Sequence, residues 1–519
     1  MSGYSDAGAS HTKNALKAFR AYSGSPISDI DFNNTTLRQR GRMLYMASPI
    51  AAAIINTNRT KIVGGGLKMK ACINGKLLGM TDEAAQSWCE KTEAEFRLWC
   101  EDRRNCDMLG QNNFYEIQQL AVKSWLMSGD VFVVIKREKP TSLNPYSIRL
   151  QLVEADRVGT PTSGGYMYGP TEGTYNNNQV HDGVEVDANG RIVAYHICSE
   201  YPEFYTKSPE WKRVVAFGEK TGIPNVLHLM NSERPDQYRG VTLLAPAIEM
   251  ILQGRRYTEA ELTAAIIQSY FTAWIETSGD ATSTPIKGNY GGEGNEADDN
   301  FDDDEEIEMS PGKVVTLKEG ETVHFGNPNV PTAGFEVFTK TINKQIGAGT
   351  ETPYDVFIKE FNSSYSASKG ALEEFAEVAK VKRSMVVADL CQPVYEIWLA
   401  EAIARGRISA PGFFDDPLIR KAWCATRWDG PAQTSLDPEK EARANEILVK
   451  NGWKTNEQVT REYYGGSWRE NIQDCTREAH MMSEYLQTVR DDTTPQYNRK
   501  QIDKAESDDK KEGEDNAEE

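Results

Sequence analysis

The sequence predicts a multidomain α+β protein, and three observations carry that prediction. Apolar residues recur at three- and four-residue steps in several long segments, which is the spacing of one helical face. Short runs rich in β-branched and aromatic residues lie between residues 131 and 229, as expected of strands. The chain has 519 residues, enough for two to four domains that each bury a core of their own.

The first 30 residues are rich in Ser, Gly and Ala, and we expect them to be mobile or loosely docked. Over 37–62 the apolar spacing predicts a helix that is interrupted or restarted at Ser48-Pro49, because proline fits a first helical turn. Three glycines at 64–66 then end the helix. They lack the GxxxxGK[ST] pattern of a phosphate-binding loop, and an alternating strand follows them, so a turn is predicted there.

The next segment is predicted to form an α+β domain that ends at Pro235. Helices are expected over 81–104 and 113–126. Val131–Ile135 is a short, continuous apolar run that fits a strand buried on both faces. Asn189-Gly190 is the sequence of a tight hairpin turn between two strands. Further strands are predicted at 149–153, 184–186, 192–197 and 226–229.

A helical hairpin is predicted to follow this domain. Its first helix spans about 242–271 and its return helix about 332–347, because each segment carries one apolar stripe, although Gln253 and Gly254 interrupt the first. The stripes consist of Leu244, Ile248, Ile251, Leu262, Ile266 and Tyr270 on the first helix and of Phe335, Phe338, Ile342 and Ile346 on the second. One hairpin has too little apolar face to stand alone, so we expect it to pack against copies of itself around an axis.

The carboxyl-terminal part is predicted to be mainly helical. A long helix is expected over 371–405 with Pro393 inside it. Since proline removes one backbone hydrogen bond and crowds the carbonyl of Asp389, the alternatives are a kinked helix and two helices that meet at a break. A short amphipathic helix is expected over 439–450, and the charged tail beyond residue 491 is expected to be disordered. Large apolar area for helix packing is expected from Trp423, Trp428 and Trp453.

The net charge of −19 is concentrated in two segments. Residues 293–308 hold ten acidic residues and no basic one, and residues 503–519 hold nine acidic residues against three basic ones. The rest of the chain is nearly neutral. Such runs are usually just solvated; the sharper interpretation is a negative surface that discourages a polyanion from sticking.

Several classes of function lack their signatures. No run approaches the roughly 20 apolar residues of a membrane span, and the polar start does not resemble a signal peptide. The eight cysteines form no CxxC pair, and the six histidines are dispersed. No GxSxG or HExxH motif appears. His181-Asp182 is interpreted as a turn rather than half of a metal site, and the acidic run at 298–306 lacks the spacing of a calcium loop. We therefore expect no catalytic residues, no metal and no cofactor.

Five short motifs, in order and at compatible spacings, carry a resemblance to a known family. They are Arg234-Pro235-Asp236-Gln237-Tyr238-Arg239-Gly240-Val241, Pro328-Asn329, Tyr354, Asn362-Ser363-Ser364-Tyr365-Ser366 and Asp437-Pro438-Glu439-Lys440-Glu441-Ala442. Together they resemble the lambda-type portal proteins of tailed phages, over roughly residues 34–484. The resemblance implies a ring, usually of twelve identical subunits, at one vertex of an icosahedral capsid, with double-stranded DNA passing through its centre during packaging and ejection.

The resemblance also implies a division of the chain and a set of partners. The division is a mobile N-terminal segment (1–30), a wing (31–241), a first stem helix (242–271), a clip (272–330) with an acidic loop (288–308), a second stem helix (331–349), a tunnel loop (350–367), a long helix kinked near Pro393 (368–405), a helical wing and crown region (406–490) and a disordered acidic tail (491–519). The implied partners are further copies of the chain, DNA, terminase, a major capsid or scaffold protein and a head-tail adaptor, with no membrane. The implied location is the virion, after assembly in the host bacterial cytoplasm.

A channel for DNA needs few cations, because many Lys or Arg contacts to phosphate would hold the DNA still. The tunnel-loop candidates are Lys359, Asn362, Ser363, Ser364, Tyr365, Ser366 and Lys369. The alternative is that the Asn-Ser-Ser run is turn chemistry before a helix N-terminus. Lys369 stands where many relatives have Arg, which keeps the charge but loses the planar fork.

Two other sets of residues complete the candidates. Those on the stem are Arg255, Arg256, Lys340 and Lys344, which could touch DNA or form ion pairs between subunits. Those for partner docking at the clip are Asp298, Asp299, Asp302, Asp303, Asp304, Glu305 and Glu306. The alternatives to a portal are a capsid or head-tail structural protein that does not conduct DNA and, less favoured, an oligomeric nuclease.

Overall fold

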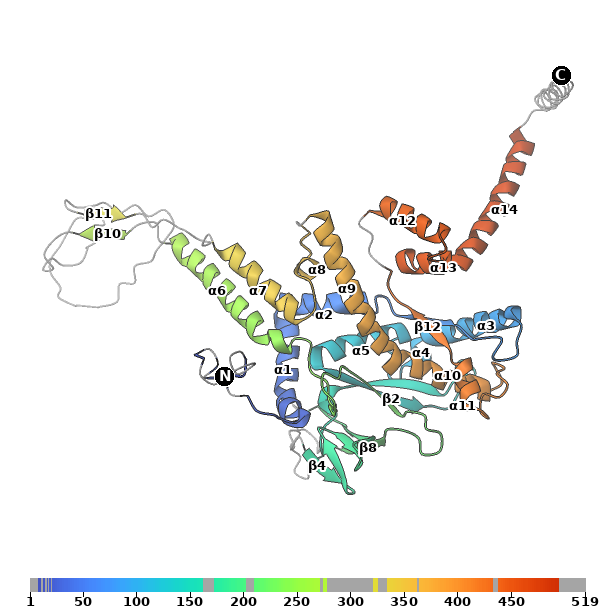
Figure 1. The fold of residues 1–519 in the computed structure, drawn as a ribbon, viewed down its shortest axis with the longest axis horizontal. Helices are drawn as coiled ribbons and strands as arrows, with labels where there is room; N and C mark the ends of the chain where they lie inside the picture. Colours follow the sequence, from blue (N-terminus) through green and yellow to red (C-terminus); the bar gives the residue numbers. More distant parts are fainter. Residues whose placement is uncertain are drawn as a thin grey trace, which may run out of the picture. The chain divides into compact units, whose positions relative to one another are not determined.

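The computed structural model describes residues 8–10, 13–14, 16, 18–19, 21–161, 172–201, 210–270, 274–277, 321–324, 334–361, 364–432 and 437–493. At 267–270, 274–277, 321–324 and 487–493 only the backbone is described. Helices and strands are mixed throughout, which confirms the α+β prediction (Figure 1). Contacts divide the chain into two units: residues 1–59, 107–109 and 120–393 form the first, and residues 60–106, 110–119 and 394–519 form the second.

The first unit begins with a π-helical turn, η2 (Ile27–Asp31), and the helices α1 (Phe32–Ala47) and α2 (Pro49–Ile62). Ser48 between them has extended backbone angles, and Pro49 starts the second helix, so the predicted interruption is confirmed. Ile30 and Asp31 are buried. The packed structure therefore begins before residue 31, slightly earlier than expected.

Two antiparallel sheets form the core of the first unit. The strand β2 (Asp130–Arg137) lies between β3 (Ile148–Glu154) and β9 (Val226–Met230), and a 3₁₀ turn, η3 (Ala155–Arg157), follows β3. Residues 131–134 are buried without exception, as predicted for a strand covered on both faces. The second sheet is a meander of five strands: β4 (Glu172–Tyr175), β5 (Asn178–His181), β6 (Val184–Val186), β7 (Ile192–Cys198) and β8 (Trp211–Val215).

The two sheets pack against each other through their apolar side chains. Phe132 from the first sheet contacts Tyr195 from the second with ring centroids 5.4 Å apart, inside one buried apolar cluster. The predicted hairpin turn is confirmed, since Gly190 has a φ of 78° and the amide of Asp187 donates to the carbonyl of Arg191. The strands β4, β5 and β8 were not predicted.

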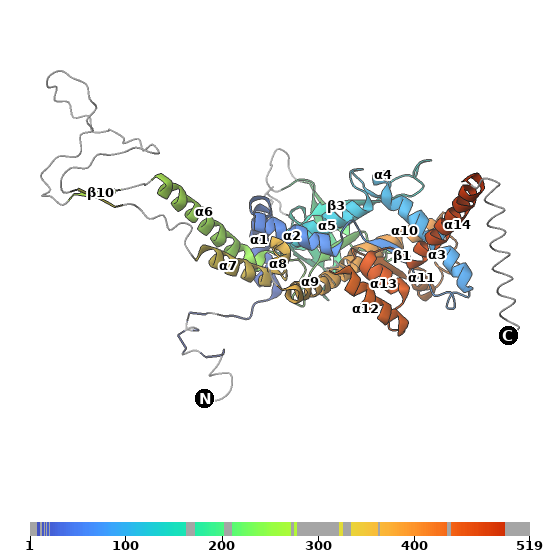
Figure 2. The same cartoon turned by 90° about the horizontal axis from the view of Figure 1, so that it is seen from above.

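The predicted helical hairpin is present. A 3₁₀ turn, η4 (Ala245–Ala247), leads into α6 (Ile248–Tyr270), and α7 (Phe335–Gly349) returns beside it; the two helices lie side by side in both views (Figures 1 and 2). The backbone between them is described at β10 (Trp274–Thr277) and β11 (Glu321–His324), which pair antiparallel. The first helix therefore starts at residue 248, later than the predicted 242.

After the hairpin, α8 (Tyr354–Ile358) and α9 (Tyr365–Val386) precede a π-helical turn, η5 (Val387–Cys391), and α10 (Gln392–Ala404). The backbone stays helical through Pro393, so the alternative of two separate helices is wrong. The π turn accounts for this, because the amide of Gln392 donates to the carbonyl of Val387, five residues earlier. The wider turn accommodates a proline that has no amide hydrogen and would crowd the carbonyl of Asp389.

The second unit is mainly helical. Its elements are β1 (Lys68–Ala71), α3 (Asp82–Glu101), α4 (Arg103–Cys106), the start of α5 (Phe114–Ser128), α10, α11 (Pro417–Trp423), β12 (Thr426–Asp429), α12 (Pro438–Lys450), α13 (Asn456–Val459), a π turn η6 (Thr460–Tyr464) and α14 (Trp468–Thr493). Strand β1 pairs antiparallel with β12, which was not predicted. The glycines at 64–66 form the predicted turn.

Aromatic side chains fill the core of the second unit. Phe96 lies at the centre, and the rings that contact it are Trp99, Phe114, Tyr395, Trp398 and Trp428. Trp423 packs on Trp88 at 4.9 Å. Trp428 and Trp423 are buried as predicted, but Trp453 is 71% exposed, so the packing role predicted for it is wrong in a single chain. None of the described helices combines the length and the apolar character that crossing a membrane requires.

Candidate functional site

The root of the α6–α7 hairpin is a packed apolar contact. Ile248 and Ile251 on α6 are buried with Ile342 and Ile346 on α7. Gly254 lies where Ile342 comes close, since a Cβ placed at Gly254 would be 3.5 Å from Ile342 Cγ2. The glycine that interrupts the apolar stripe in the sequence is therefore part of the contact between the two helices.

The outer half of the hairpin has an apolar face that no other described residue covers. Tyr257 contacts Phe335 and Phe338, with ring centroids 5.6 and 4.8 Å away. Leu262, further along α6, is 61% exposed, and Phe338 is itself 49% exposed. The stripe predicted from the sequence is thus buried only in its inner half in a single chain. A groove of about 380 Å³ also opens beside the hairpin root, between α6, α7 and the start of α2.

The four stem cations differ in their contacts. Arg255 Nε lies 2.8 Å from Glu259 Oε1 on the next turn of α6, and Lys340 Nζ lies 3.3 Å from Glu360 Oε1. Arg256 and Lys344 have no acidic partner among the residues that the structure describes. Half of the stem charge is therefore already neutralised within one chain.

The segment after α7 turns back through α8, which occupies part of the predicted tunnel loop. Tyr354 donates a 2.8 Å hydrogen bond to Glu360 Oε2, and the ammonium of Lys340 lies 5.5 Å from the Tyr354 ring. Burial and the hydrogen bond to Glu360 raise the pKa of Tyr354 to about 12. These contacts attach the end of the loop to α7, while Lys359 is exposed and adopts a left-handed conformation.

A cluster of polar side chains, Asn58, Glu351, Thr352 and Lys382, fixes the start of this loop; we call it the polar hub. Thr352 Oγ1 accepts from Asn58 Nδ2 at 2.8 Å, and all of these atoms are buried. Lys382 Nζ on α9 lies 3.4 Å from Asn58 Oδ1 and 3.1 Å from Glu351 Oε2. The hub joins α2, the end of α7 and α9, so the loop is held at its base by side chains from three elements.

The end of the predicted tunnel loop contains a helix-capping residue and exposed polar residues. Ser364 caps α9 by accepting from the amide of Ala367 at 3.4 Å, which is the turn chemistry given as the alternative. Tyr365 and Ser366 are exposed, and Lys369 lies 3.7 Å from Glu373. Asn362 and Ser363 lie outside the described residues.

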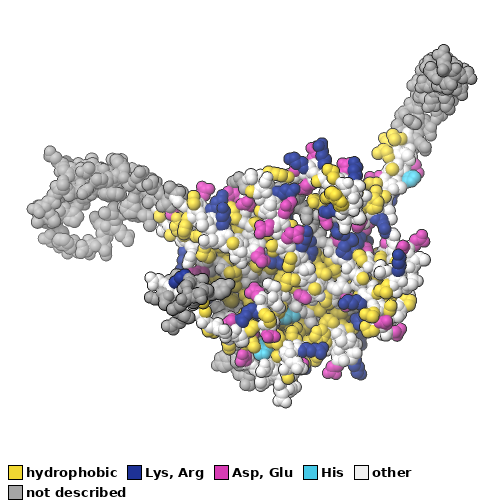
Figure 3. Space-filling model, viewed as in Figure 1, with side chains coloured by type: hydrophobic (Ala, Val, Ile, Leu, Met, Phe, Trp, Pro, Cys, Tyr) yellow, Lys and Arg dark blue, Asp and Glu magenta, His cyan; other side chains and the backbone are white. Residues whose placement is uncertain are grey.

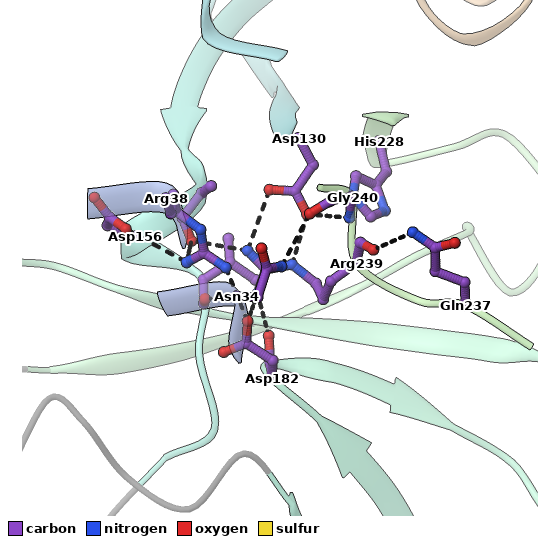
Figure 4. Close-up of polar contacts among 12 residues, drawn as sticks. Asn34, Arg38, Asp130, Asp156, Asp182, His228, Gln237, Arg239 and Gly240 are labelled. Atoms are coloured by element: carbon purple, nitrogen blue, oxygen red, sulfur yellow. Dashed lines mark hydrogen bonds and ion pairs between the residues drawn. The ribbon is translucent and has the colours of Figure 1, made fainter. Parts of the chain in front are cut away.

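A buried network of charges holds the motif at 234–241, which precedes the hairpin in the chain (Figure 4). The guanidinium of Arg239 is fully buried. Its Nε donates to Asp130 Oδ2 at 2.6 Å, its Nη groups donate to the carbonyls of Val158 and Ala155 at 3.0 Å each, and Nη1 also meets Asp182 Oδ2 at 2.8 Å. The five donors of one arginine thus connect β2, the residues that follow β3 and the β5–β6 turn.

A second arginine extends the network to α1. Arg38 Nη2 lies 3.0 Å from Asp182 Oδ2, and its Nη1 lies 3.4 Å from Asp156 Oδ1. Asn34, one turn earlier, donates to the carbonyl of Gly240 at 2.9 Å. His181-Asp182 is therefore a structural turn, as predicted, but the carboxylate of Asp182 has a further use as the shared partner of two arginines.

One aspartate of the network, Asp31, forms no ion pair with either arginine. Burial opposes ionisation of Asp130, but Arg239 and the hydrogen bond with His228 hold the pKa of Asp130 well below its usual value. Burial raises the pKa of Asp31 to about 7, with the charge of Asp182 acting in the same direction. Oδ2 of Asp31 is buried without a hydrogen-bond partner. The carboxylate of Asp31 is thus the least stabilised of the network.

Sequence reasoning identified Arg239 only as part of a motif and missed Asp31, Arg38, Asp130 and Asp156. The signal for Arg38 was its place on the buried face of α1, in phase with Leu44. The acidic candidates at 298–306 lie outside the described residues. Among the described residues, no group of three or more His, Cys, Asp or Glu side chains is arranged to hold a metal ion.

Comparison with known proteins gives a consistent result. The family model described as "Phage portal protein, lambda family" matches residues 12–383. A probable portal protein of Halomonas phage phiHAP-1 is 25% identical over 440 residues, which are 82% of this chain and 76% of the relative. Portal protein B of Escherichia phage lambda is 21% identical over 439 residues, 82% of this chain and 80% of the relative. Among solved structures, a chain of the "Neck of native GTA particle computed with C12 symmetry" is 11% identical, with a TM-score of 0.42 over 82% of this chain and 92% of that chain.

Proposed function

The chain belongs to the lambda family of phage portal proteins, and on that premise we propose that identical copies of it form a closed ring at one vertex of a tailed-phage capsid. Double-stranded DNA passes through the centre of the ring during packaging and ejection. The ring acts as a conduit and a docking platform rather than as an enzyme, and it resides in the virion.

The exposed outer half of the α6–α7 hairpin is the observation that carries the proposal. Burying apolar area stabilises by about 25 cal/mol per Å², so an uncovered stripe that includes Leu262 and Phe338 favours association. A stripe that runs along one helical hairpin is covered efficiently by the neighbouring hairpin of a second copy. Repeating that contact around an axis closes a ring whose inner wall is made of hairpins.

The proposal includes the division of the chain that the family resemblance implies. Residues 31–241 form the wing, α6 and α7 form the stem, and 272–330 form the clip at the outer end of the stem. Residues 350–367 form the tunnel loop, residues 368–405 the long helix, and 406–490 the wing and crown region. The buried network around Arg239 lies where the wing meets the stem, and we assign it the task of holding that joint rigid.

The charges on the hairpin and loop suit passage of DNA rather than tight binding. Phosphate contacts by Lys and Arg are independent of sequence and add affinity with each contact. Arg255, Lys340 and Lys369 are already paired with carboxylates in one chain. Arg256, Lys344 and Lys359 remain for DNA or for ion pairs between subunits, and the exposed Tyr365 and Ser366 offer weak hydrogen bonds. A ring with few free cations per subunit lets DNA slide.

The clip is the docking site for terminase and later for a head-completion or tail-adaptor protein. The acidic run at 298–306 suits a partner with a basic surface, because attraction between opposite charges steers association. Deleting residues 293–308 is expected to weaken partner binding and to remove its salt dependence. Unchanged affinity and unchanged salt dependence would refute this assignment.

Negative-stain imaging of the purified protein tests the ring, with a variant that targets the exposed stripe. Wild type is expected to form rings with a central hole, and Leu262→Asp is expected to lose them while keeping its far-UV circular dichroism. The matched control is Glu261→Asp, one residue away on the same helix, which leaves the stripe unchanged and should assemble. A wild-type monomer or dimer at micromolar concentration would contradict the proposal.

A further inference from the structure

A pocket opens between the two sheets of the first unit, and we call it the sandwich pocket. Its volume is about 440 Å³, and residues of β2, β3, η3, β7 and β8 line it. Its floor is the apolar cluster between the sheets, because Val134, Val153 and Ile197 belong to that cluster and Val214 packs against it. Figure 3 shows hydrophobic side chains exposed over the region of β2 and β8, with Lys or Arg side chains beside them. The apolar core of the sheets is therefore accessible at this place.

Three cations surround the apolar floor. Lys136 on β2 and Lys212 on β8 come from facing sheets, and neither forms an ion pair within the part of the chain that the structure describes. Arg157 donates from Nε and Nη2 to the carbonyl of Cys198 at 3.0 and 2.9 Å, so its guanidinium is held in place but its charge is not neutralised. Glu210 is the one carboxylate among the lining residues. Three cations against one carboxylate give the pocket an excess of positive charge, on a chain whose net charge is −19.

The two lysines repel each other. Burial lowers the pKa of Lys136, and the charge of Lys212 acts in the same direction. The pattern of the strands accounts for this placement, since Val134 and Lys136 lie on one side of β2 and Lys212 and Val214 lie on one side of β8. Each strand thus continues from an apolar residue of the floor to a cation at the rim. Like charges that face each other without a counter-charge cost free energy, and an anion bound between them removes that cost.

The lining favours a ligand that carries both an apolar group and carboxylates. An apolar side chain would cover the floor, and carboxylates beside it would reach the lysines. A small inorganic anion would leave the floor uncovered, and a DNA duplex is too wide to enter a pocket of about 440 Å³. A peptide with a large apolar residue among acidic ones meets both requirements, and the side chains of Gln151 and Ser199 in the lining can form hydrogen bonds with its backbone.

We infer that the sandwich pocket binds an acidic peptide segment of a partner protein, with an apolar side chain on the floor and carboxylates at Lys136 and Lys212. One chain contains the whole site, so the inference goes beyond the proposed function and does not depend on ring formation. The partner differs in chemistry from the one proposed for the clip, because the acidic run at 298–306 suits a basic surface and the sandwich pocket suits an acidic one.

The experiment uses the full-length protein and follows limited acetylation of its lysines by mass spectrometry. The probe is the peptide Glu-Glu-Phe-Glu-Glu with blocked ends, compared at equal ionic strength with Glu-Glu-Gly-Glu-Glu and with a short DNA duplex. Acetylation of Lys136 and Lys212 is expected to slow as the phenylalanine peptide is added, by about threefold when two thirds of the sites are filled. Lys76, which is exposed in the second unit, is the internal reference and should react at an unchanged rate.

Two variants locate the binding site. Lys136→Gln removes one of the two facing charges and is expected to weaken the protection of Lys212 by the peptide. The matched control is Lys139→Gln, which changes an exposed lysine three residues further along the chain and should leave that protection intact. Circular dichroism checks that both variants are folded.

The inference is overturned if the phenylalanine peptide gives no protection, or if the glycine peptide or the DNA protects Lys136 and Lys212 equally well. Equal loss of protection in the two variants overturns it as well. Negative-stain images of the same samples record ring formation, so these outcomes leave the proposed function standing, and an absence of rings contradicts that function alone.

Discussion

Replacing Arg239 by lysine tests whether the buried network holds the joint between the sheets and the hairpin. The change keeps the positive charge but replaces a planar fork of five donors by three donors on a single nitrogen. Arg239 donates to Asp130 through two nitrogens, to the carbonyls of Val158 and Ala155 at 3.0 Å each, and to the carbonyl of Asp182. A lysine cannot reach all of these acceptors together.

The cost follows from the acceptors that lose their donor. Each buried polar group left unsatisfied costs about 1–3 kcal/mol, and at least two carbonyls are affected, so Arg239→Lys is expected to destabilise the joint by about 2–6 kcal/mol. Because a factor of ten corresponds to about 1.4 kcal/mol, local opening should become at least roughly 30-fold more frequent.

Hydrogen exchange of the backbone amides measures this opening directly. Amides of β2 and of residues 237–242 are expected to exchange faster in Arg239→Lys, whereas those of the second unit should be unchanged. Arg255→Lys is the matched control, since its ion pair with Glu259 is exposed and such pairs contribute about 0.3–0.5 kcal/mol. Exchange in β2 that does not differ between the two variants would refute the reasoning.

Two further predictions concern the same region. Burial raises the pKa of Asp31 from its ordinary value of 3.8 to about 7, so its stabilising contribution is fully present below about pH 4 and is lost as the pH rises through 7. Asp31→Asn should therefore raise the thermal unfolding temperature at pH 8, where the gain in the free energy of unfolding is up to about 4 kcal/mol, and should change this temperature little at pH 4. Equal shifts of the unfolding temperature at both pH values would contradict the raised pKa of Asp31. Gly240→Ala should prevent soluble expression or unfold the joint, because the new Cβ would overlap the carbonyl of Gly129. Gly349→Ala is its control, since the added Cβ meets Pro246 at an ordinary 3.8 Å; equal solubility of the two variants would show that the close approach is not required.

Local signals in the sequence were sufficient to predict those elements whose boundaries depend on only a few residues. Ser48-Pro49 marked the break between α1 and α2, and Asn189-Gly190 marked the β6–β7 hairpin, because each depends on the backbone preferences of two residues. The apolar stripes predicted α6 and α7. Strands β4, β5 and β8 were missed because they are short and carry many polar residues, so neither alternation nor β-branched residues distinguish them from loops.

The buried network could not be predicted, because its members are far apart in the chain. Asp130 and Arg239 are separated by 109 residues, and Arg38 and Asp182 by 144. A single charged residue is usually on the surface, and only the fold reveals that these four charges meet away from water. Trp453 illustrates the opposite error: a large apolar side chain suggested a core position, yet it is exposed in one chain.

We propose that copies of this chain form a closed ring whose channel is lined by the α6–α7 hairpins. Electron cryomicroscopy of the purified full-length protein can show this arrangement directly. We expect a reconstruction with a central hole, in which α6 and α7 of neighbouring copies cover each other's exposed stripe and the loop before α9 faces the hole. A ring with the hairpins on its outer rim, or particles with no closed ring, would contradict it.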